Sequence, residues 1–165
     1  MKISIIVAAD ENGCIGKDGK LPWHFKEDMQ WFKKLTDGKA VIFGRKTIES
    51  LPKKLENRFV CRISSSRVVP SDSFFDQNCT NLDNAIDVCR YKGFDHCFIG
   101  GGAQIYRQAL DVAHDIILTK VPGKYDGDVY FPDWPLNNWV LFDEVTVPNE
   151  HGLRFCYFKR IFPNP

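Results

Sequence analysis

The stretch that decides how this chain folds runs from Leu21 to Thr36 and reads LPWHFKEDMQWFKKLT. Pro22 is typical of a position just ahead of a helix and Gly38 of one just past its end, so we predict a helix from Phe25 to Asp37. At the helical repeat the apolar side chains of this segment form one stripe, which consists of Phe25, Met29, Phe32 and Leu35. The stripe should pack against the rest of the molecule.

Asp28 lies on the apolar side of this predicted helix, on the same flank as Trp31, Phe32 and Leu35. A buried carboxylate without a partner costs several kcal/mol or takes up a proton. One interpretation is that Asp28 complements the helix dipole in the first turn and turns back to water. The other is that it lines a pocket and offers two acceptor oxygens to a planar ligand with paired N–H donors. The helix alone leaves both open.

Length and charge set the class of protein. The 165 residues suit a single domain over 1–165 with one core. Lys and Arg number 22 against 21 for Asp and Glu, so no overall field attracts nucleic acid or an anionic membrane. No apolar run reaches the length of a membrane span, and the first residues lack the cleavage region of a signal peptide. We expect a cytoplasmic protein.

The cysteines and histidines are scattered. No pair of cysteines has a CxxC spacing, which favours free and mostly buried thiols over disulfides: Cys14, Cys61, Cys79, Cys89, Cys97 and Cys156. The histidines show no metal-ligand spacing, so we predict no metal site: His24, His96, His114 and His151.

Two predicted strands end in segments suited to a ligand. Ile3 to Ala9 is a continuous apolar run, and a long glycine-punctuated loop follows it, as is typical of a lid. Ala40 to Phe43 runs into Gly44, Arg45, Lys46 and Thr47, which open a short helix through Ser50. Backbone N–H groups, two cations and a hydroxyl at a helix start favour anion binding, although a solvated first turn has the same composition.

Two further strands end in the same manner. Phe59 to Ile63 is followed by Ser64, Ser65, Ser66 and Arg67. Cys97 to Ile99 is followed by Gly100, Gly101 and Gly102, which open a helix to about Leu110. The glycine run lacks the full GxGxxG spacing, so by itself it is a weak motif. In open α/β sheets ligands lie outside the carboxyl ends of the strands, where all these segments belong.

The remaining segments complete the expected fold. We predict irregular structure over 68–80, a helix capped by Thr80 or Asn81, and a strand from Ile116 to Val121. Two long strands, 139–147 and 153–162, form a hairpin. The fold class is therefore α/β, with a mostly parallel central sheet flanked by helices and a C-terminal antiparallel hairpin.

Taken together, these residues resemble dihydrofolate reductase over essentially the whole chain. The resemblance rests on spaced elements: Ala8, Ile15-Gly16, Leu21-Pro22-Trp23, Asp28 with Phe32 and Thr36, Gly44 to Thr47, Glu49-Ser50, Leu55, Arg58, Ser64-Ser65, Gly101-Gly102 with Tyr106, Thr119, Gly127-Asp128 and Phe131-Pro132. It implies NADPH-dependent reduction of 7,8-dihydrofolate to 5,6,7,8-tetrahydrofolate, which feeds one-carbon metabolism and thymidylate and purine synthesis. Hydride would pass from nicotinamide C4 to pterin C6, with protonation at N5.

The resemblance also implies roles for residues around the substrate. Asp28 would bind the pterin N3 and 2-amino groups beside Thr119, and the N5 proton would come from water admitted near Leu21, beside Trp23. The slot would be lined by Ile6, Val7, Met29, Phe32, Leu51 and Gly100, with Leu55 against the aminobenzoyl ring and Arg58 on the glutamate α-carboxylate. Antifolates of the methotrexate or trimethoprim type would compete there. We expect a monomer.

On the cofactor side the implied residues are more numerous. Those near the nicotinamide and under the lid are Ala8, Cys14, Ile15, Gly16, Lys17, Asp18, Gly19 and Lys20. Those for the phosphates and the adenosine are Gly44, Arg45, Lys46, Thr47, Ile63, Ser64, Ser65, Ser66 and Arg67, together with Gly100, Gly101, Gly102, Ala103, Gln104, Ile105 and Tyr106. Hydroxyls and cations without an acidic residue at that strand end favour NADPH over NADH. Asp128 would hold the lid at Gly16 and Lys17.

This chain departs from the family pattern at a few positions. Gly100 stands where members usually carry a larger residue, so the family's cis-linked glycine pair is either Gly101-Gly102 or Gly100-Gly101. Gln104 replaces a basic residue, and Arg62 interrupts an apolar strand. Two rivals remain: a riboflavin-pathway reductase, which has no use for an acid at Asp28, and a catalytically silent member, which has no reason to keep Asp28, Arg58 and the cofactor loop together.

Overall fold

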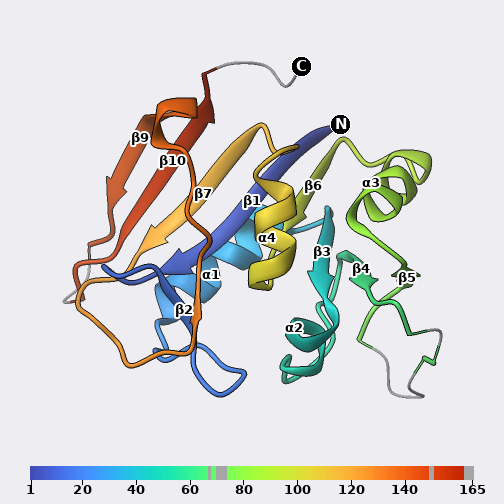
Figure 1. Ribbon diagram of the computed structural model, residues 1–165, viewed down its shortest axis with the longest axis horizontal. Helices are drawn as coiled ribbons and strands as arrows, with labels where there is room; N and C mark the ends of the chain where they lie inside the picture. Colours follow the sequence, from blue (N-terminus) through green and yellow to red (C-terminus); the bar gives the residue numbers. More distant parts are fainter. Residues whose placement is uncertain (67, 70–73, 149–150, 162–165) are drawn as a thin grey trace.

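The computed structural model describes residues 1–66, 68–69, 74–148 and 151–161. Its centre is an eight-stranded sheet with the order β5-β4-β3-β6-β1-β7-β10-β9 (Figure 1). The strands are β1 Lys2–Ala9, β3 Ala40–Gly44, β4 Phe59–Ile63, β5 Gln77–Cys79, β6 His96–Ile99, β7 Asp115–Lys120, β9 Trp139–Thr146 and β10 Arg154–Arg160. The helices are α1 Lys26–Thr36, α2 Arg45–Glu49, α3 Leu82–Tyr91, α4 Ala103–Ala109 and the 3₁₀ turn η1 Leu136–Asn138.

The sheet is parallel except at one edge. β1 pairs in parallel with β6 and β7, and β3 pairs in parallel with β4 and β6. β10 is antiparallel to both β7 and β9, so the hairpin closes the sheet as predicted. The predicted fold class is confirmed. Because the parallel strands run the same way, the ends of β1, β3, β4, β6 and β7 meet along one edge.

The helices divide between the two faces of the sheet. One core cluster joins alternate residues of β1, β3 and β6 to α3 and α4, and includes Ile5, Ile42 and Ile99. The other lies on the face covered by α1 and α2 and includes Ile6, Val41 and Phe98. The period of two along a strand explains why neighbouring residues of one apolar run separate onto opposite faces.

The cysteines of the chain are free and buried, as predicted. Several sit in the core beneath α3, where the Cys61 and Cys89 sulfurs lie 3.8 Å apart. Within the described residues, no group of three or more His, Cys, Asp or Glu side chains gathers as metal ligands would. No helix in the described ranges is long and apolar enough to cross a membrane.

Some elements differ from the prediction. β5 lies in the segment predicted to be irregular, and a two-stranded ribbon of β2 Cys14–Gly16 and β8 Val129–Tyr130 was not predicted. These strands are two or three residues long, so they carry no readable alternation. α1 is one residue shorter at each end than predicted. The prediction that the last strand reaches residue 162 lies partly outside the described residues.

Candidate active site

Asp28 lies in the first turn of α1, and its side chain faces the sheet. The Thr119 hydroxyl, on β7, donates a hydrogen bond of 2.6 Å to Asp28 Oδ1. Burial raises the pKa of Asp28 above its ordinary value of 3.8, and the hydrogen bond from Thr119 opposes that rise. The carboxylate is therefore directed inward, and the interpretation that it turns back to water does not hold. Its role toward a planar ligand stays a prediction. Thr119 occupies Oδ1, and no hydrogen bond to Oδ2 is found within the described residues.

A carboxylate placed in this way costs stability at neutral pH. Because the folded-state pKa is raised, ionising Asp28 is harder in the folded protein than in the unfolded chain, so stability falls as pH rises above the ordinary value. An asparagine at this position would be neutral throughout and would still accept from Thr119. We therefore expect Asp28→Asn to resist urea better than the natural chain near neutral pH, with the gap closing as pH falls toward 3.8. Urea titrations over this pH range measure it, and a less stable variant at neutral pH contradicts it.

The apolar residues predicted around the substrate lie mostly together. Ile6 is buried in the cluster beneath α1, and the partly buried side chains packed against that cluster include Phe32, Leu51 and Leu55. Met29 is 42 % exposed on the same helix. The Val7 side chain packs in the opposite core cluster, because side chains alternate along β1, so the structure does not bring it together with Ile6.

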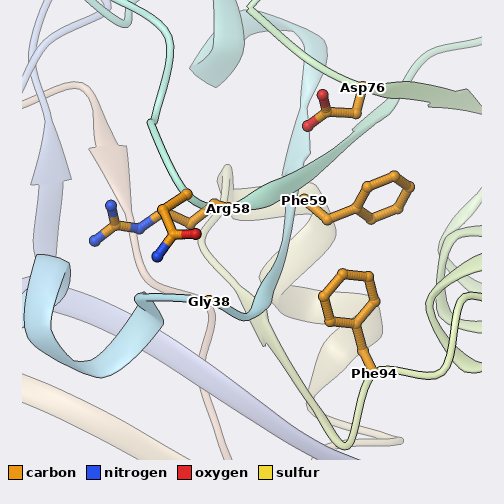
Figure 2. Close-up of a pocket in the computed structure, with 6 residues that line it drawn as sticks. Gly38, Arg58, Phe59, Asp76 and Phe94 are labelled. Atoms are coloured by element: carbon orange, nitrogen blue, oxygen red, sulfur yellow. The ribbon is translucent and has the colours of Figure 1, made fainter.

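Arg58 is held rigidly against the end of α1. Its Nε donates to Thr36 Oγ1 at 3.1 Å, Nη1 donates to the Glu56 carbonyl at 2.6 Å and Nη2 donates to the Lys33 carbonyl. An N–H on each terminal nitrogen remains, which suits a carboxylate. Arg58 also lines a cavity of about 260 Å³ together with Gly38, Asn57, Phe59, Asp76 and Phe94, but its guanidinium points away from the Phe59, Asp76 and Phe94 side chains (Figure 2).

The glycine-punctuated loop of residues 10–20 is here called the lid. Leu21 and Trp23 lie between this lid and α1. Leu21 is 52 % exposed, whereas Trp23 is buried and packs edge-on against Tyr125, with ring centroids 5.1 Å apart. Trp23 Nε1 is buried and has no hydrogen-bond partner among the described residues. A buried indole N–H normally finds a partner, so this donor suits a polar atom of a ligand or a water.

The glycine run after β6 has a definite register. The peptide bond between Gly101 and Gly102 is cis, which settles the open alternative in favour of that pair. The Gly44 N–H donates to the Gly101 carbonyl at 2.7 Å, so the ends of β3 and β6 are joined here. A Cβ on Gly102 would have only Thr47 Oγ1 nearby, at 3.5 Å. The backbone of Gly102 is thus open to close approach by a cofactor.

The position of the Phe43 ring explains why residue 100 is a glycine. A Cβ built on Gly100 would lie 2.3 Å from Cε1 of the Phe43 ring, so the ring fills the volume that a larger residue would take. Phe43 is 4 % exposed and therefore has little room to move. The Phe43 ring, from β3, thus occupies the space that a side chain at residue 100, just after β6, would fill. The predicted contact between Gly100 and the substrate would then come from its backbone.

The close contact between Gly100 and Phe43 predicts that a substitution at Phe43 restores the stability lost by a substitution at Gly100. Gly100→Ala should lower the free energy of unfolding by about 1–3 kcal/mol through overpacking. Phe43→Leu in the same chain should recover most of that loss, because it removes the ring atoms that clash. Chemical denaturation of both single variants and the double variant measures the coupling. Additive losses would contradict the account.

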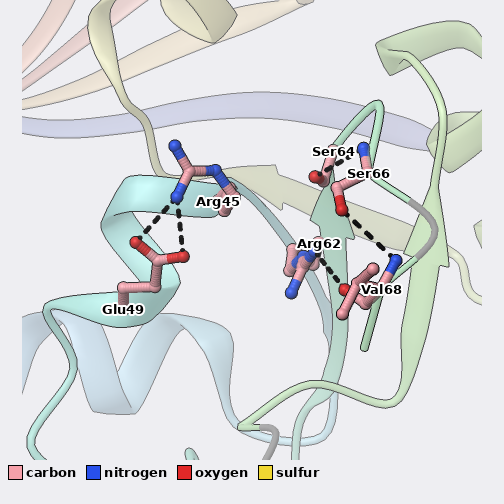
Figure 3. A network of polar contacts seen from close by, with 6 residues as sticks. All are labelled: Arg45, Glu49, Arg62, Ser64, Ser66 and Val68. Atoms are coloured by element: carbon pink, nitrogen blue, oxygen red, sulfur yellow. Dashed lines mark hydrogen bonds and ion pairs between the residues drawn. The ribbon is translucent and has the colours of Figure 1, made fainter. Parts of the chain in front are cut away.

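The predicted phosphate residues surround the starts of α2 and α4. Neither helix has a side-chain cap, so their first N–H groups are free to meet an anion. Arg45 Nη1 donates to both carboxylate oxygens of Glu49, at 2.9 and 3.1 Å (Figure 3). A cofactor phosphate must therefore share Arg45 with that carboxylate. Lys46 is exposed and Thr47 half-buried.

The serine segment after β4 folds into a tight turn. The Ser64 hydroxyl accepts from the Ser66 N–H, and the Ser66 hydroxyl accepts from the Val68 N–H, both at 3.2 Å (Figure 3). Ser65 is exposed on the same turn. Arg67, to which a role was also assigned, lies outside the described residues. Ile63 packs against the α3 side of the core, and Gln104 is exposed on α4.

The structure explains how Arg62, a charged residue, fits into an apolar strand. Its guanidinium lies over the Phe75 ring at 4.9 Å, and Nη2 donates to the Val68 carbonyl at 3.4 Å. The side chain is 2 % exposed. It therefore braces the serine turn from beneath. No pattern around Arg62 in the sequence predicts these partners, since Phe75 is distant along the chain.

The lid is joined to the loop between β7 and β8. The Asp128 N–H donates to the Gly16 carbonyl at 3.0 Å, and Asp128 Oδ2 accepts from the Asp18 N–H at 3.1 Å. The predicted partner Gly16 is correct, but the second is Asp18, because Lys17 pairs with Asp126.

The other predicted residues of the lid form its turn and its inner side. Gly19 has a positive φ of 77° in the turn between Lys17 and Lys20, which bridge each other. Ile15 is half-buried beside the core and Cys14 is buried.

The other predicted cofactor residues lie at the same edge. Tyr106 is buried, its ring lies against Gly101, and its hydroxyl donates to the Ile6 carbonyl at 2.8 Å. Burial raises the pKa of Tyr106, and the charge of Asp28 adds to the rise. Ile105 is buried below Gly44, and Ala103 begins α4. Ala8 is half-buried at the end of β1, opposite Thr119 in register.

A half-buried acid beside a hydroxyl, at a sheet edge with open helix starts, places the chain among the α/β enzymes that bind a flat heterocycle and a phosphate-bearing cofactor side by side. The family model described as dihydrofolate reductase matches residues 2–160. The dihydrofolate reductase of Bacillus subtilis (strain 168) is 40 % identical over 155 residues, which are 92 % of this chain and 85 % of that protein. That of Haemophilus influenzae is 34 % identical over 163 residues, 96 % of each.

A solved structure agrees with the fold. The dihydrofolate reductase from Enterococcus faecalis, complexed with NADP(H) and RAB-propyl, has a TM-score of 0.84, 24 % identity, and coverage of 98 % of this chain and 97 % of its own. The chain belongs to the dihydrofolate reductase family, and its reaction is the NADPH-dependent reduction of 7,8-dihydrofolate to 5,6,7,8-tetrahydrofolate in one-carbon metabolism. The resemblance stated from the sequence is confirmed.

Proposed function

We propose that the chain carries out this reduction as a cytoplasmic monomer, with Asp28 as the anchor of the pterin ring. The observation that carries the proposal is the 2.6 Å hydrogen bond from Thr119 to Asp28 Oδ1. It fixes the rotation of the carboxylate and leaves its other lone pairs facing the slot. Two oxygens in one plane match the N3 and 2-amino donors of a pterin, and such charge-assisted pairs are among the stronger hydrogen bonds.

Orientation is the main contribution that the chain makes to hydride transfer. NADPH supplies the hydride when it is bound. The open backbone at Gly102 and the buried Tyr106 beside Gly101 support a nicotinamide placed at this edge of the sheet. Asp28 fixes the pterin on the α1 side of β1, and Ala8 at the strand end is small enough for two rings to meet. Holding two reactants in contact geometry contributes about 7–11 kcal/mol in favourable cases.

The proton for N5 comes from water rather than from a side chain in this proposal. Leu21, which is 52 % exposed, is the gate through which that water enters. The unpartnered Trp23 Nε1 supports a polar contact at this point. Asp28 stays ionised when the pterin donors bind and raises the electron density of the ring.

Selectivity for NADPH comes from the serine turn and the start of α2 in the same proposal. Ser65 and Ser66 are exposed on the turn that Arg62 braces. Figure 3 shows Arg45, at the start of α2, across from Ser64 and Ser66. These groups would bind the 2′-phosphate that NADH lacks. Loss of one or two charged hydrogen bonds of about 1.5–3 kcal/mol each is expected to cost about 10- to 100-fold or more in kcat/KM with NADH.

The test is oxidation of NADPH by the purified chain in the presence of dihydrofolate. We expect turnover with NADPH, weak turnover with NADH, and competition by a 2,4-diaminopyrimidine antifolate. Absence of any oxidation would favour the catalytically silent rival. Equal rates with both cofactors would remove the role proposed for the serine turn. Size-exclusion chromatography with light scattering tests the monomer.

A further inference from the structure

Asp10 is a buried carboxylate that the reaction scheme above does not use. It follows β1 and is 7 % exposed. Its Oδ1 accepts from the Asn12 N–H at 2.9 Å and from the Cys14 N–H at 2.8 Å. Its Oδ2 accepts from the Tyr125 N–H at 2.7 Å. Three backbone donors on one buried carboxylate make a rigid junction, because each hydrogen bond to a charged group is stronger than a neutral one.

The junction joins two loops that also meet beside it, where the Glu11 N–H donates to the Gly123 carbonyl and the Gly123 N–H donates to Glu11 Oε1, both at 3.1 Å. Asn12 and Cys14 are the first part of the lid, whereas Tyr125 belongs to the loop between β7 and β8. At the outer end the same loops meet through Asp128 and Asp18, and both of these residues are exposed. Among the contacts between the loops, the one at Asp10 is therefore buried and charge-assisted, whereas the one between Asp128 and Asp18 is open to water.

The effect of Asp10 reaches the reaction through Tyr125. The Tyr125 ring packs edge-on against Trp23, with centroids 5.1 Å apart, and both belong to one small apolar cluster. Leu21 and Trp23 come directly after the last residue of the lid. Asp10 therefore fixes the start of the lid through Asn12 and Cys14 and its end through Tyr125 and Trp23.

We propose that Asp10 is a positioning residue. Its three hydrogen bonds, here called the pin, hold the inner end of the lid in place, while the exposed contact of Asp128 with Asp18 is the part that opens. The proposal rests on the roles proposed above for the lid and for Trp23. The close packing of Gly127 supports it, since a Cβ there would lie 2.0 Å from Cys14 Sγ and 2.9 Å from the Gly16 carbonyl oxygen. The lid can leave Asp128 without losing its inner attachment.

The variant that tests the pin is Asp10→Asn. An asparagine has one acceptor oxygen and turns an NH₂ toward one of the two loops, so either the lid or Tyr125 loses its acceptor. We expect hydride transfer in a single turnover to slow by about 10- to 100-fold, since small displacements away from the chemistry cost this much. The isotope effect on kcat with deuterated NADPH should rise. KM for dihydrofolate should stay near that of the natural chain.

Asp95→Asn is the matched control, because Asp95 is exposed and paired with Lys39 at 2.9 Å at the other end of the sheet. Its rates should equal those of the natural chain. A second variant, Tyr125→Leu, keeps the backbone N–H for Asp10 but removes the ring that contacts Trp23, and should reproduce the hydride defect with a smaller loss of stability. The proposal is overturned if Asp10→Asn lowers stability while hydride transfer and the isotope effect stay unchanged.

Amide hydrogen exchange separates this proposal from the reaction scheme. In Asp10→Asn we expect faster exchange at Cys14 and Tyr125, and unchanged exchange in β3 and β6. This readout needs no turnover. If the natural chain failed to oxidise NADPH, the proposed function would fall while the exchange pattern still decided whether Asp10 pins the lid. Unchanged exchange at both amides would overturn the pin.

Discussion

Asp28→Asn is expected to lower kcat/KM for dihydrofolate by about 10²- to 10³-fold, the range that removing one preorganised electrostatic contact costs. Asparagine keeps the acceptor for Thr119, so the geometry of the slot should survive. It loses the negative charge and turns an N–H₂ toward a pterin N–H donor, so both the strength and the direction of the anchor are lost. Hydride transfer should suffer more than binding of NADPH.

Glu27→Gln is the control for this prediction. Glu27 precedes Asp28 in the first turn of α1 and shares the helix dipole, but Thr119 hydrogen-bonds to Asp28. Its activity should stay within about twofold, because a first-turn acid away from the slot contributes only about 0.3–1 kcal/mol to the helix. Single-turnover rates of both variants against pH make the comparison. Equal rates for Asp28→Asn and the natural chain would leave the acid without a role.

Arg58→Lys is expected to raise KM for dihydrofolate by about 10- to 100-fold with little change in kcat. The guanidinium is held by Thr36 Oγ1 and by the Glu56 and Lys33 carbonyls, and a lysine ammonium cannot reproduce that fork. Losing one charged hydrogen bond of about 1.5–3 kcal/mol gives roughly this range. The contact lies far from the reacting ring, so it should affect ground state and transition state alike.

A substrate without the glutamate separates binding from structural damage. With a reduced pterin that lacks the aminobenzoyl-glutamate tail, Arg58→Lys and the natural chain should have the same kcat/KM. Arg90→Lys is the control, because Arg90 is exposed and pairs with the equally exposed Asp87, at 3.2 Å. An equal loss with the short substrate would mean that Arg58 supports α1 and not the ligand.

The sequence predicted the elements that have a strong periodic signal. The apolar runs ending at Ala9, Phe43, Ile63 and Ile99 are strands, and α1 lies within one residue of its predicted bounds at each end. Continuous apolar runs favour central parallel strands, which the sheet order bears out. Short polar strands such as β5, and the ribbon of β2 with β8, give no such signal.

The site was predicted in part from residues and in part from resemblance. An acid on the apolar flank of α1 could be recognised from spacing, but its partner Thr119 lies 91 residues away and no local pattern indicates it. Ile6 and Val7 were assigned to one wall of the slot, but neighbours on a strand face opposite sides, and the two side chains pack in different clusters. Phe43 filling the space at Gly100, and Asp10 beneath the lid, depend on contacts between distant segments.

The central claim is that Asp28 binds the pterin through two hydrogen bonds while Thr119 holds its carboxylate. The most direct measurement is a crystal structure of the chain with folate and NADP⁺, from which two distances are taken, from the Asp28 oxygens to pterin N3 and to the 2-amino nitrogen. We predict both at about 2.7–3.1 Å, with the Thr119 contact retained. A pterin ring bound elsewhere, with both Asp28 oxygens beyond about 4 Å from its nitrogens, would contradict the account.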